Sequence, residues 1–219
     1  MVLRISVQEG FNDLPPIAQL QEFYTKALAR ENIKPHFLAL PLARSAQLAD
    51  NGEIDGEMIR SLNIIEKYPN LIATSKPIGF SNFLILYAKS NRSFKEKKLP
   101  QYKGLIILNS FTTRQKARDM RLRLDAVPTI DQGLSMVVAG RADYIILAEP
   151  IIDSLPRSLK PLMDQLKTVK EPFSRVPLYF ILNKKHKDLM PKLEKALFKT
   201  MSTEGHNYRY LKDFLNTGA

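Results

Sequence analysis

The residue whose placement most clearly suggests chemistry is Arg60, which directly follows an apolar pair at the end of a predicted strand. A cation in that position is costly unless it has a target. A guanidinium group can clamp a carboxylate or a phosphate with two parallel hydrogen bonds. We therefore expect Arg60 to bind an anionic group, with an interlobe or surface salt bridge as the alternative. Ser61, Asn63 and Tyr68 follow closely and are further candidates for ligand contacts.

A second group of polar residues opens the predicted helix at 110–122. Ser110, Thr112 and Thr113 stand at its start, where free backbone amides and neighbouring hydroxyls favour an anionic group. Arg114 adds a cation to the same turn. The alternative is that one of these hydroxyls only caps the helix.

Three further side chains could contact the same ligand. Phe11 and Phe80 could cover an apolar or planar part of it, and Glu9 could accept a hydrogen bond from a cationic or hydroxyl group. Each has a structural alternative, because the phenylalanines could pack into the core and Glu9 could be solvated.

Composition excludes several kinds of site. The chain has 219 residues and no cysteine, which rules out disulfides, thiolate catalysis and cysteine-based zinc sites. Its three histidines are widely scattered, so we expect no metal site, and the sequence suggests no cofactor. No apolar run approaches the roughly 18–20 residues that span a membrane. The first residues resemble a strand, so either the protein is cytosolic or a signal segment has been removed.

The net charge of +11 raises the question of a polyanionic partner. The densest basic run, Arg114–Arg123, has five cations but no interleaved aromatic residue and no recognisable nucleic-acid motif. We therefore expect a solvated basic surface and no nucleic-acid binding.

Hydrophobic periodicity predicts strands that alternate with helices, and this order favours mostly parallel sheets covered by helices. The predicted strands are 3–8, 34–41, 54–59, two runs within 70–89, 105–109, 142–150, one near 165–170, and 178–183. The predicted helices are 15–28, 42–50, 110–122, 129–140, 189–200 and 207–216. Residues 91–104 are polar and are expected to form an exposed connection.

One pattern occurs twice in the chain. Gly52 and Asp55 align with Gly140 and Asp143, 88 residues later, and each pair lies between a predicted helix and a predicted strand. The glycine suits the left-handed position that ends a helix, and the aspartate can bond turn amides before the strand. The repeat favours two α/β lobes of related design, although any helix-to-strand unit could look similar.

Four segments together resemble bacterial extracellular solute-binding proteins of the amino-acid-transporter type. They are "LRISVQEGF", "GEIDGEMIRSLNIIEKYPNLIATSKPI", "YKGLIILNSFTTRQKA" and "TIDQGLSMVVAGRADYIILAE". The resemblance implies an α/β, two-lobed periplasmic binding protein-like fold of type II, with two mostly parallel sheets and a two-strand hinge. It places lobe one at residues 1–89 and 177–219, lobe two at 90–176, and the ligand in the cleft between them.

The sequence also departs from this family's amino-acid binders. Where they usually hold the ligand carboxylate with an arginine, this chain has Tyr68. Where they usually hold the ammonium with an acidic residue, it has Ala148, with Glu149 next to it. Arg60 could supply the cation from a different position, and Glu149 joins the candidate ligand residues. A small organic anion is then a reasonable alternative to an α-amino acid.

The resemblance implies a monomeric, periplasmic or extracellular protein that captures a small polar, carboxylate-bearing solute by hinge closure for an ABC-type transporter. One alternative is a ligand-sensing domain of a receptor or regulator. Another is a dehydratase-like enzyme on the same fold, with Glu9 and Glu149 as its only obvious acid or base candidates. No compact catalytic constellation is visible, so we expect no catalytic residues.

Overall fold

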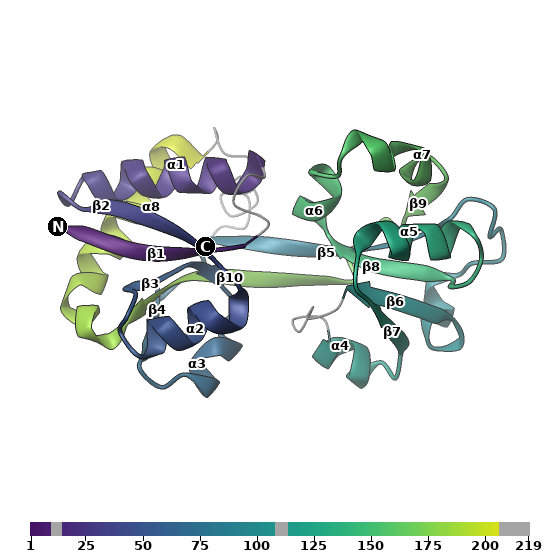
Figure 1. Cartoon of the computed structure of the whole chain (residues 1–219), viewed down its shortest axis with the longest axis horizontal. Helices are drawn as coiled ribbons and strands as arrows, with labels where there is room; N and C mark the ends of the chain where they lie inside the picture. Colours follow the sequence, from purple (N-terminus) through teal and green to yellow (C-terminus); the bar gives the residue numbers. More distant parts are fainter. Residues whose placement is uncertain (10–14, 108–113, 206–219) are drawn as a thin grey trace. The chain divides into compact units, whose positions relative to one another are not determined.

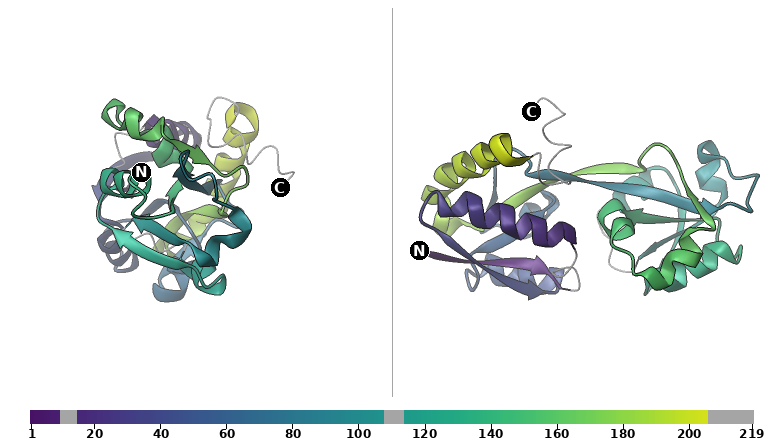
Figure 2. Two further views of the ribbon diagram at one scale, coloured as in Figure 1. Left: turned by 90° about the vertical axis from the view of Figure 1, so that its right-hand side faces the viewer. Right: turned by 90° about the horizontal axis from the view of Figure 1, so that it is seen from above.

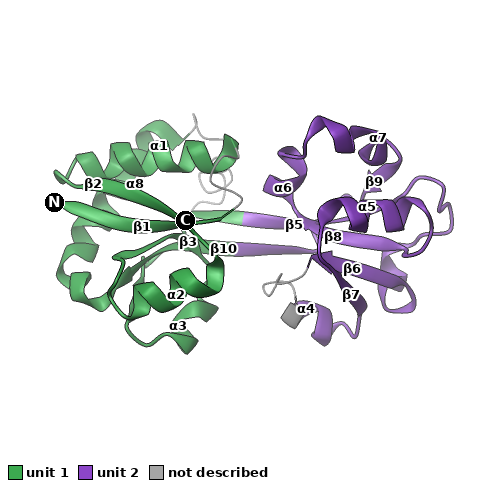
Figure 3. Cartoon of the chain, viewed as in Figure 1, with its two compact units in different colours: residues 1–80, 177–219 green, residues 81–176 purple. Residues whose placement is uncertain are grey.

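The computed structural model describes residues 1–9, 15–107 and 114–205, and the chain divides into two compact units (Figures 1 and 3). Unit 1 comprises Met1–Phe80 and Pro177–Ala219, and unit 2 comprises Ser81–Val176. The chain passes between the units within two long strands, β5 (Gly79–Ala88) and β10 (Ser174–Asn183). The first passage falls after Phe80 and not near residue 89, because most of β5 pairs inside unit 2.

The sheet of unit 1 has the order β2-β1-β3-β10, and β4 pairs with β10. The first three strands are parallel, whereas β10 runs antiparallel to β3 and β4. The sheet is therefore mixed, with its parallel part built from the N-terminal half of the unit. The remaining strands are β1 (Val2–Gln8), β2 (Lys34–Leu40), β3 (Gly56–Arg60) and β4 (Leu71–Ala73).

Helices cover both faces of this sheet. One face packs against α1 (Pro15–Ala29) and α8 (Met190–Glu204), which lie side by side (Figure 2, right). The other face packs against α2 (Leu42–Asp50) and the short α3 (Asn63–Lys67). A 3₁₀ segment, η3 (Lys184–Leu189), joins β10 to α8.

The sheet of unit 2 has the order β5-β8-β6-β7, and β9 pairs with β5. Strands β6, β7 and β8 are parallel, and β5 is antiparallel to β8. The apolar run of β8 is buried on both faces, which is typical of a strand inside a covered parallel sheet. The strands are β6 (Lys103–Ile107), β7 (Arg123–Val127), β8 (Tyr144–Ala148) and β9 (Leu166–Thr168).

Two clusters of buried side chains flank this second sheet. The first includes α5 (Ile130–Val138), with α6 (Glu149–Asp153), η2 (Arg157–Leu159) and α7 (Lys160–Met163) at its margin. The second includes α4 (Arg114–Asp119) and η1 (Glu96–Gln101). Residues 91–104 are therefore not a purely exposed connection, because Leu99 is buried and Phe94 stacks on Tyr87 and Tyr102.

The glycine and aspartate that occur twice in the sequence have equivalent conformations and contacts in the two units. Gly52 and Gly140 have φ angles of +76° and +69°, the left-handed conformation expected at a helix end. Asp55 accepts a hydrogen bond from the backbone N–H of Arg4 at 2.7 Å, and Asp143 accepts one from Lys103 at 2.8 Å. Each carboxylate thus bonds the strand parallel to the one that follows it, β1 in unit 1 and β6 in unit 2, and not the turn amides that the sequence suggested.

The sequence did not predict strand β7, the short helices α3, α6 and α7, or the 3₁₀ segments η1, η2 and η3. Strand β7 was missed because "RLDAV" carries Arg123 and Asp125 within a short run, and its residues are mostly exposed at a sheet edge. Helices α3 and α6 have only five residues each, too few for helical periodicity to show. The helix predicted at 207–216 lies outside the described residues.

Candidate functional site

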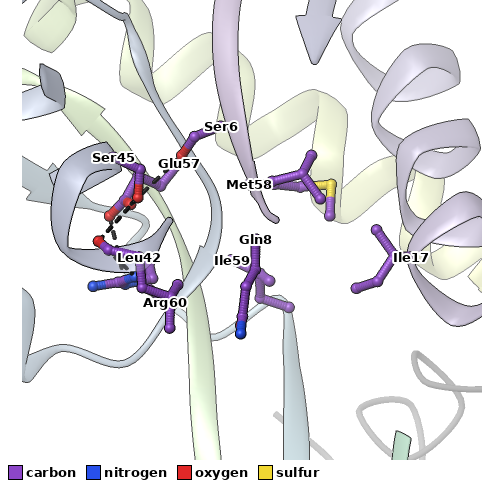
Figure 4. A pocket seen from close by; sticks show the side chains of 10 residues that line it. Ser6, Gln8, Ile17, Leu42, Ser45, Glu57, Met58, Ile59 and Arg60 are labelled. Atoms are coloured by element: carbon purple, nitrogen blue, oxygen red, sulfur yellow. Dashed lines mark hydrogen bonds and ion pairs between the residues drawn. The ribbon is translucent and has the colours of Figure 1, made fainter. Parts of the chain in front are cut away.

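A pocket lies at the carboxyl edge of the parallel strands β1 and β3 in unit 1, and α1 and α2 contribute to its wall (Figure 4). The empty space is about 380 Å³, open solvent included. Parallel α/β sheets commonly bind ligands at this edge. The lining residues are Ser6, Val7, Gln8, Ile17, Leu42, Ser45, Glu57, Met58, Ile59 and Arg60.

The pocket has a polar side and an apolar side. Ser45, Glu57 and Arg60 lie together on one side, and Ile17 and Met58 lie on the other (Figure 4). The apolar wall is fixed from behind, because the buried Tyr24 hydroxyl of α1 donates to the backbone oxygen of Met58 at 2.5 Å. This hydrogen bond ties β3, which supplies one wall of the pocket, to the first helix.

Glu57 is the least exposed charged group of the pocket, with 2% of its side chain accessible. Its Oε1 accepts hydrogen bonds from Ser45 at 2.5 Å and from Ser6 at 3.5 Å. Burial raises the pKa of Glu57, while the charge of Arg60 and the two hydroxyl groups act in the opposite direction.

Arg60 is the last residue of β3, and 19% of its side chain is exposed. Its Nε lies 3.5 Å from Oε2 of Glu57, and its Nη1 donates to the backbone oxygen of Leu42 at 3.4 Å. A guanidinium group has five N–H donors, so these two long contacts leave capacity for a ligand. Arg60 thus pairs with a buried carboxylate within unit 1, which differs from the interlobe or surface salt bridge considered from the sequence, and it also lines the pocket. Its role in ligand binding stays a prediction.

The other candidates of unit 1 that the structure describes do not line this pocket. Glu9 is exposed just after β1, and Asn63 is exposed at the start of α3. Ser61 is half-buried after β3. Tyr68 packs against the core between the sheet and α2, with the Lys67 ammonium 5.4 Å from its ring centre. Phe80 packs at the edge of the core beneath α1 and α8.

Glu149 belongs to unit 2, where it is the first residue of α6 directly after β8. It accepts a hydrogen bond from Asn82 Nδ2 at 2.9 Å. The other side-chain atom of that amide, Asn82 Oδ1, is buried without a hydrogen-bond partner among the described residues. Glu149 is therefore held in a defined orientation at the carboxyl edge of the second sheet.

The remaining candidates cannot be placed. Phe11, Ser110, Thr112 and Thr113 lie outside the described residues, as does the side chain of Arg114. Their proposed contacts stay predictions from the sequence.

Sequence reasoning missed the residues that surround Arg60. Glu57 precedes it by three positions, a spacing that places two side chains on opposite faces of a regular strand, so the sequence contains no signal for this pair. The β3–β10 register shifts between the two residues. Ser6 and Ser45 come from β1 and α2, and no local pattern links them to Glu57. Gln8, at the end of β1, also lines the pocket.

Within residues 1–9, 15–107 and 114–205, no group of three histidine, cysteine or acidic side chains could hold a metal ion. In the same ranges, no helix has the length and apolar character needed to cross a membrane.

The sequence matches no protein-family model and no curated protein at a significant level. Its structure is similar to an ancestral arginine-binding protein bound to arginine, with a TM-score of 0.70, 19% identity, and coverage of 97% of this chain and 96% of that chain. It is similar to the periplasmic VFT2 domain of BvgS from Bordetella pertussis, with a TM-score of 0.70, 14% identity, and coverage of 95% and 93%.

A third similar structure is the ancestral amino acid-binding protein AncCDT-1, a precursor of cyclohexadienyl dehydratase. Its TM-score is 0.66 at 21% identity, with coverage of 97% of this chain and 94% of that chain. Identities this low establish the fold alone. The chain has the two-lobed, type II periplasmic binding protein fold, as its sequence motifs predicted.

Proposed function

We propose that this protein binds a small carboxylate-bearing solute and that Arg60 holds the solute's anionic group. The observation that carries the proposal is the position of Arg60 in a pocket at the carboxyl edge of parallel strands. Its contacts with Glu57 and Leu42 leave guanidinium N–H donors available for a ligand. Two of the similar structures are amino-acid-binding proteins, one of them bound to arginine, which supports a solute with a carboxylate group.

The apolar wall of the pocket adds a second element of recognition. Ile17, Met58 and Ile59 face the same space as Arg60, so the solute would carry an apolar segment next to its anionic group. Ser61, Asn63, Tyr68, Glu9 and Glu149 remain proposed contacts that depend on closure of the two units over the solute.

Thermal-shift screening of amino acids, carboxylic acids and polyamines tests this proposal. A ligand present at a hundred times its dissociation constant stabilises the folded state by about 2.7 kcal/mol. The shift should disappear in Arg60→Met and persist in Arg44→Ala, which removes the same charge from an exposed position on α2. A full ligand-induced shift in Arg60→Met would remove this arginine from the site.

We further propose that the protein delivers its solute to an ABC-type transporter outside the cytoplasm. The alternative is a ligand-sensing domain, which is supported by the similarity to a histidine kinase sensor domain that resembles periplasmic binding proteins. Deleting the gene separates the two roles. Loss of solute uptake supports transport, whereas normal uptake with loss of a solute-dependent transcriptional response supports sensing. Small-angle scattering with the solute checks closure, which predicts a smaller radius of gyration.

A further inference from the structure

The pocket contains an acid that an anion-binding site does not obviously need. Glu57 occupies a strand position between a glycine and a methionine, where an apolar residue would bury more easily. Instead its carboxylate is buried beside the arginine proposed to receive an anionic ligand. An ionised Glu57 offsets the charge of Arg60 and weakens its attraction for any anion.

The two oxygens of Glu57 have different surroundings. Oε1 accepts from the hydroxyls of Ser45 and Ser6, which satisfy it. Oε2 is buried and has no hydrogen-bond partner among the described residues, although Arg60 Nε lies 3.5 Å away. A fully ionised carboxylate normally has both oxygens hydrogen-bonded when it is buried. Oε2 is therefore the position at which a proton could be added with the least disturbance.

Few charged groups act on Glu57 from the elements packed around it. Strand β1 presents Ser6, and α2 presents Ser45, with the neighbouring Arg44 exposed to solvent. Strand β10 places Ile181 opposite Glu57 in the register. Arg60 supplies the one charge that affects the carboxyl group among the described residues, and burial opposes it.

We propose that Glu57 takes up a proton when an anion binds to Arg60, so that the pocket binds an anion and a proton together. This inference rests on the proposed function, because it assumes that Arg60 is the anion site. The physical reason is charge repulsion. An anion on Arg60 would lie close to the Glu57 carboxylate in a partly desolvated space, and like charges in such a space favour protonation of one of them.

The consequence is that the affinity of the pocket for an anion rises as the pH falls. Uptake of one proton per anion tightens binding by up to tenfold for each pH unit through the titration range of Glu57, and binding levels off below it. An anion whose own charge is constant over this range isolates the effect of the protein.

Sulfate is a suitable probe because it stays a dianion between pH 5 and 8.5. Isothermal titration of the whole chain with sulfate should give tighter binding at pH 5.5 than at pH 8, by several-fold or more. Titrations in buffers with different ionisation enthalpies should show net proton uptake. In Glu57→Gln, binding should be tight at both pH values and proton uptake should vanish.

A second variant shows whether Glu57 acts through its ionisation and not only by shape. Ser45→Ala removes a hydrogen bond that favours the charged form of Glu57. It should therefore move the midpoint of the pH dependence upward, and an unchanged midpoint would contradict a role for the ionisation of Glu57. Circular dichroism confirms that each variant is folded.

The outcomes distinguish the two proposals. Sulfate binding by the wild type with no pH dependence and no proton uptake refutes the coupling and leaves Arg60 as an anion site. A pH dependence that survives in Glu57→Gln also refutes it. If neither the wild type nor Glu57→Gln binds sulfate at any pH, then Arg60 is not an anion site and both proposals are wrong.

Discussion

Replacing Asp55 with asparagine should weaken unit 1 by an amount that depends on pH. Asp55 lies between α2 and β3, with 9% of its side chain exposed. Its Oδ2 accepts from the backbone N–H of Arg4 at 2.7 Å, and its Oδ1 lies 2.8 Å from both Lys185 Nζ and His186 Nε2. Asparagine keeps the shape of the side chain but loses its charge, so these contacts weaken while packing is preserved.

The magnitude follows from the pKa of Asp55. Burial by itself raises this pKa, but hydrogen bonds from Lys185, the Arg4 backbone and His186, with the charge of Lys185, lower it from an ordinary 3.8 to about 2. Each pKa unit corresponds to about 1.4 kcal/mol, so the ionised group contributes about 2 kcal/mol to folding. Because the folded-state pKa is depressed, this contribution is present above pH 3.8 and is lost as the pH falls through about 2.

Urea unfolding of both proteins, followed by circular dichroism from pH 2.5 to 7, measures the difference in unfolding free energy. We expect Asp55→Asn to be less stable by about 2 kcal/mol at pH 7, with the gap narrowing below pH 4. Asp143→Asn is the matched control, since Asp143 makes the equivalent backbone contact to Lys103 in unit 2. The unfolding free energy of Asp143→Asn should fall by only about 1 kcal/mol. A gap below 0.5 kcal/mol at pH 7, or one that stays constant to pH 2.5, would refute this reasoning.

Three further substitutions test the structure by the same measurement. Arg60→Met should lower the free energy of unfolding by about 3–5 kcal/mol at pH 8, because it leaves the buried Glu57 carboxylate without its cation. The loss should be smaller at lower pH, such as pH 5, because protonation of Glu57 removes the unpaired charge. An equal loss of unfolding free energy at pH 8 and pH 5 would contradict the buried ion pair of Arg60 with Glu57. Gly140→Ala should lower the free energy of unfolding by about 1 kcal/mol, because only the positive φ opposes it. Within the described parts of the chain, no atom beyond the adjacent residues lies within 4 Å of the added Cβ. Gly56→Ala should prevent folding of unit 1, because the new Cβ would lie 2.1 Å from the Ile181 backbone oxygen; a folded variant with wild-type stability would show that this strand pairing is wrong.

Much of the fold could be predicted from the sequence because its signals are local. Alternation located β1, apolar runs located β2 and β8, and helical spacing located α1 and α8. Two glycines with positive φ marked equivalent turns in the two units. Elements with weak local signals were missed, such as the exposed edge strand β7 and the five-residue helices. Their conformations depend on the sheets against which they pack.

The sequence by itself determined that Arg60 stands where a parallel strand ends, since strand periodicity and a following polar turn are enough to place it. Only the tertiary structure decided what surrounds Arg60. Ser6 and Ser45 reach Glu57 because β1 and α2 pack beside β3, across separations of 51 and 12 residues along the chain. Burial then changes the proton affinity of Glu57, and burial is a property of the packed chain that no single segment carries.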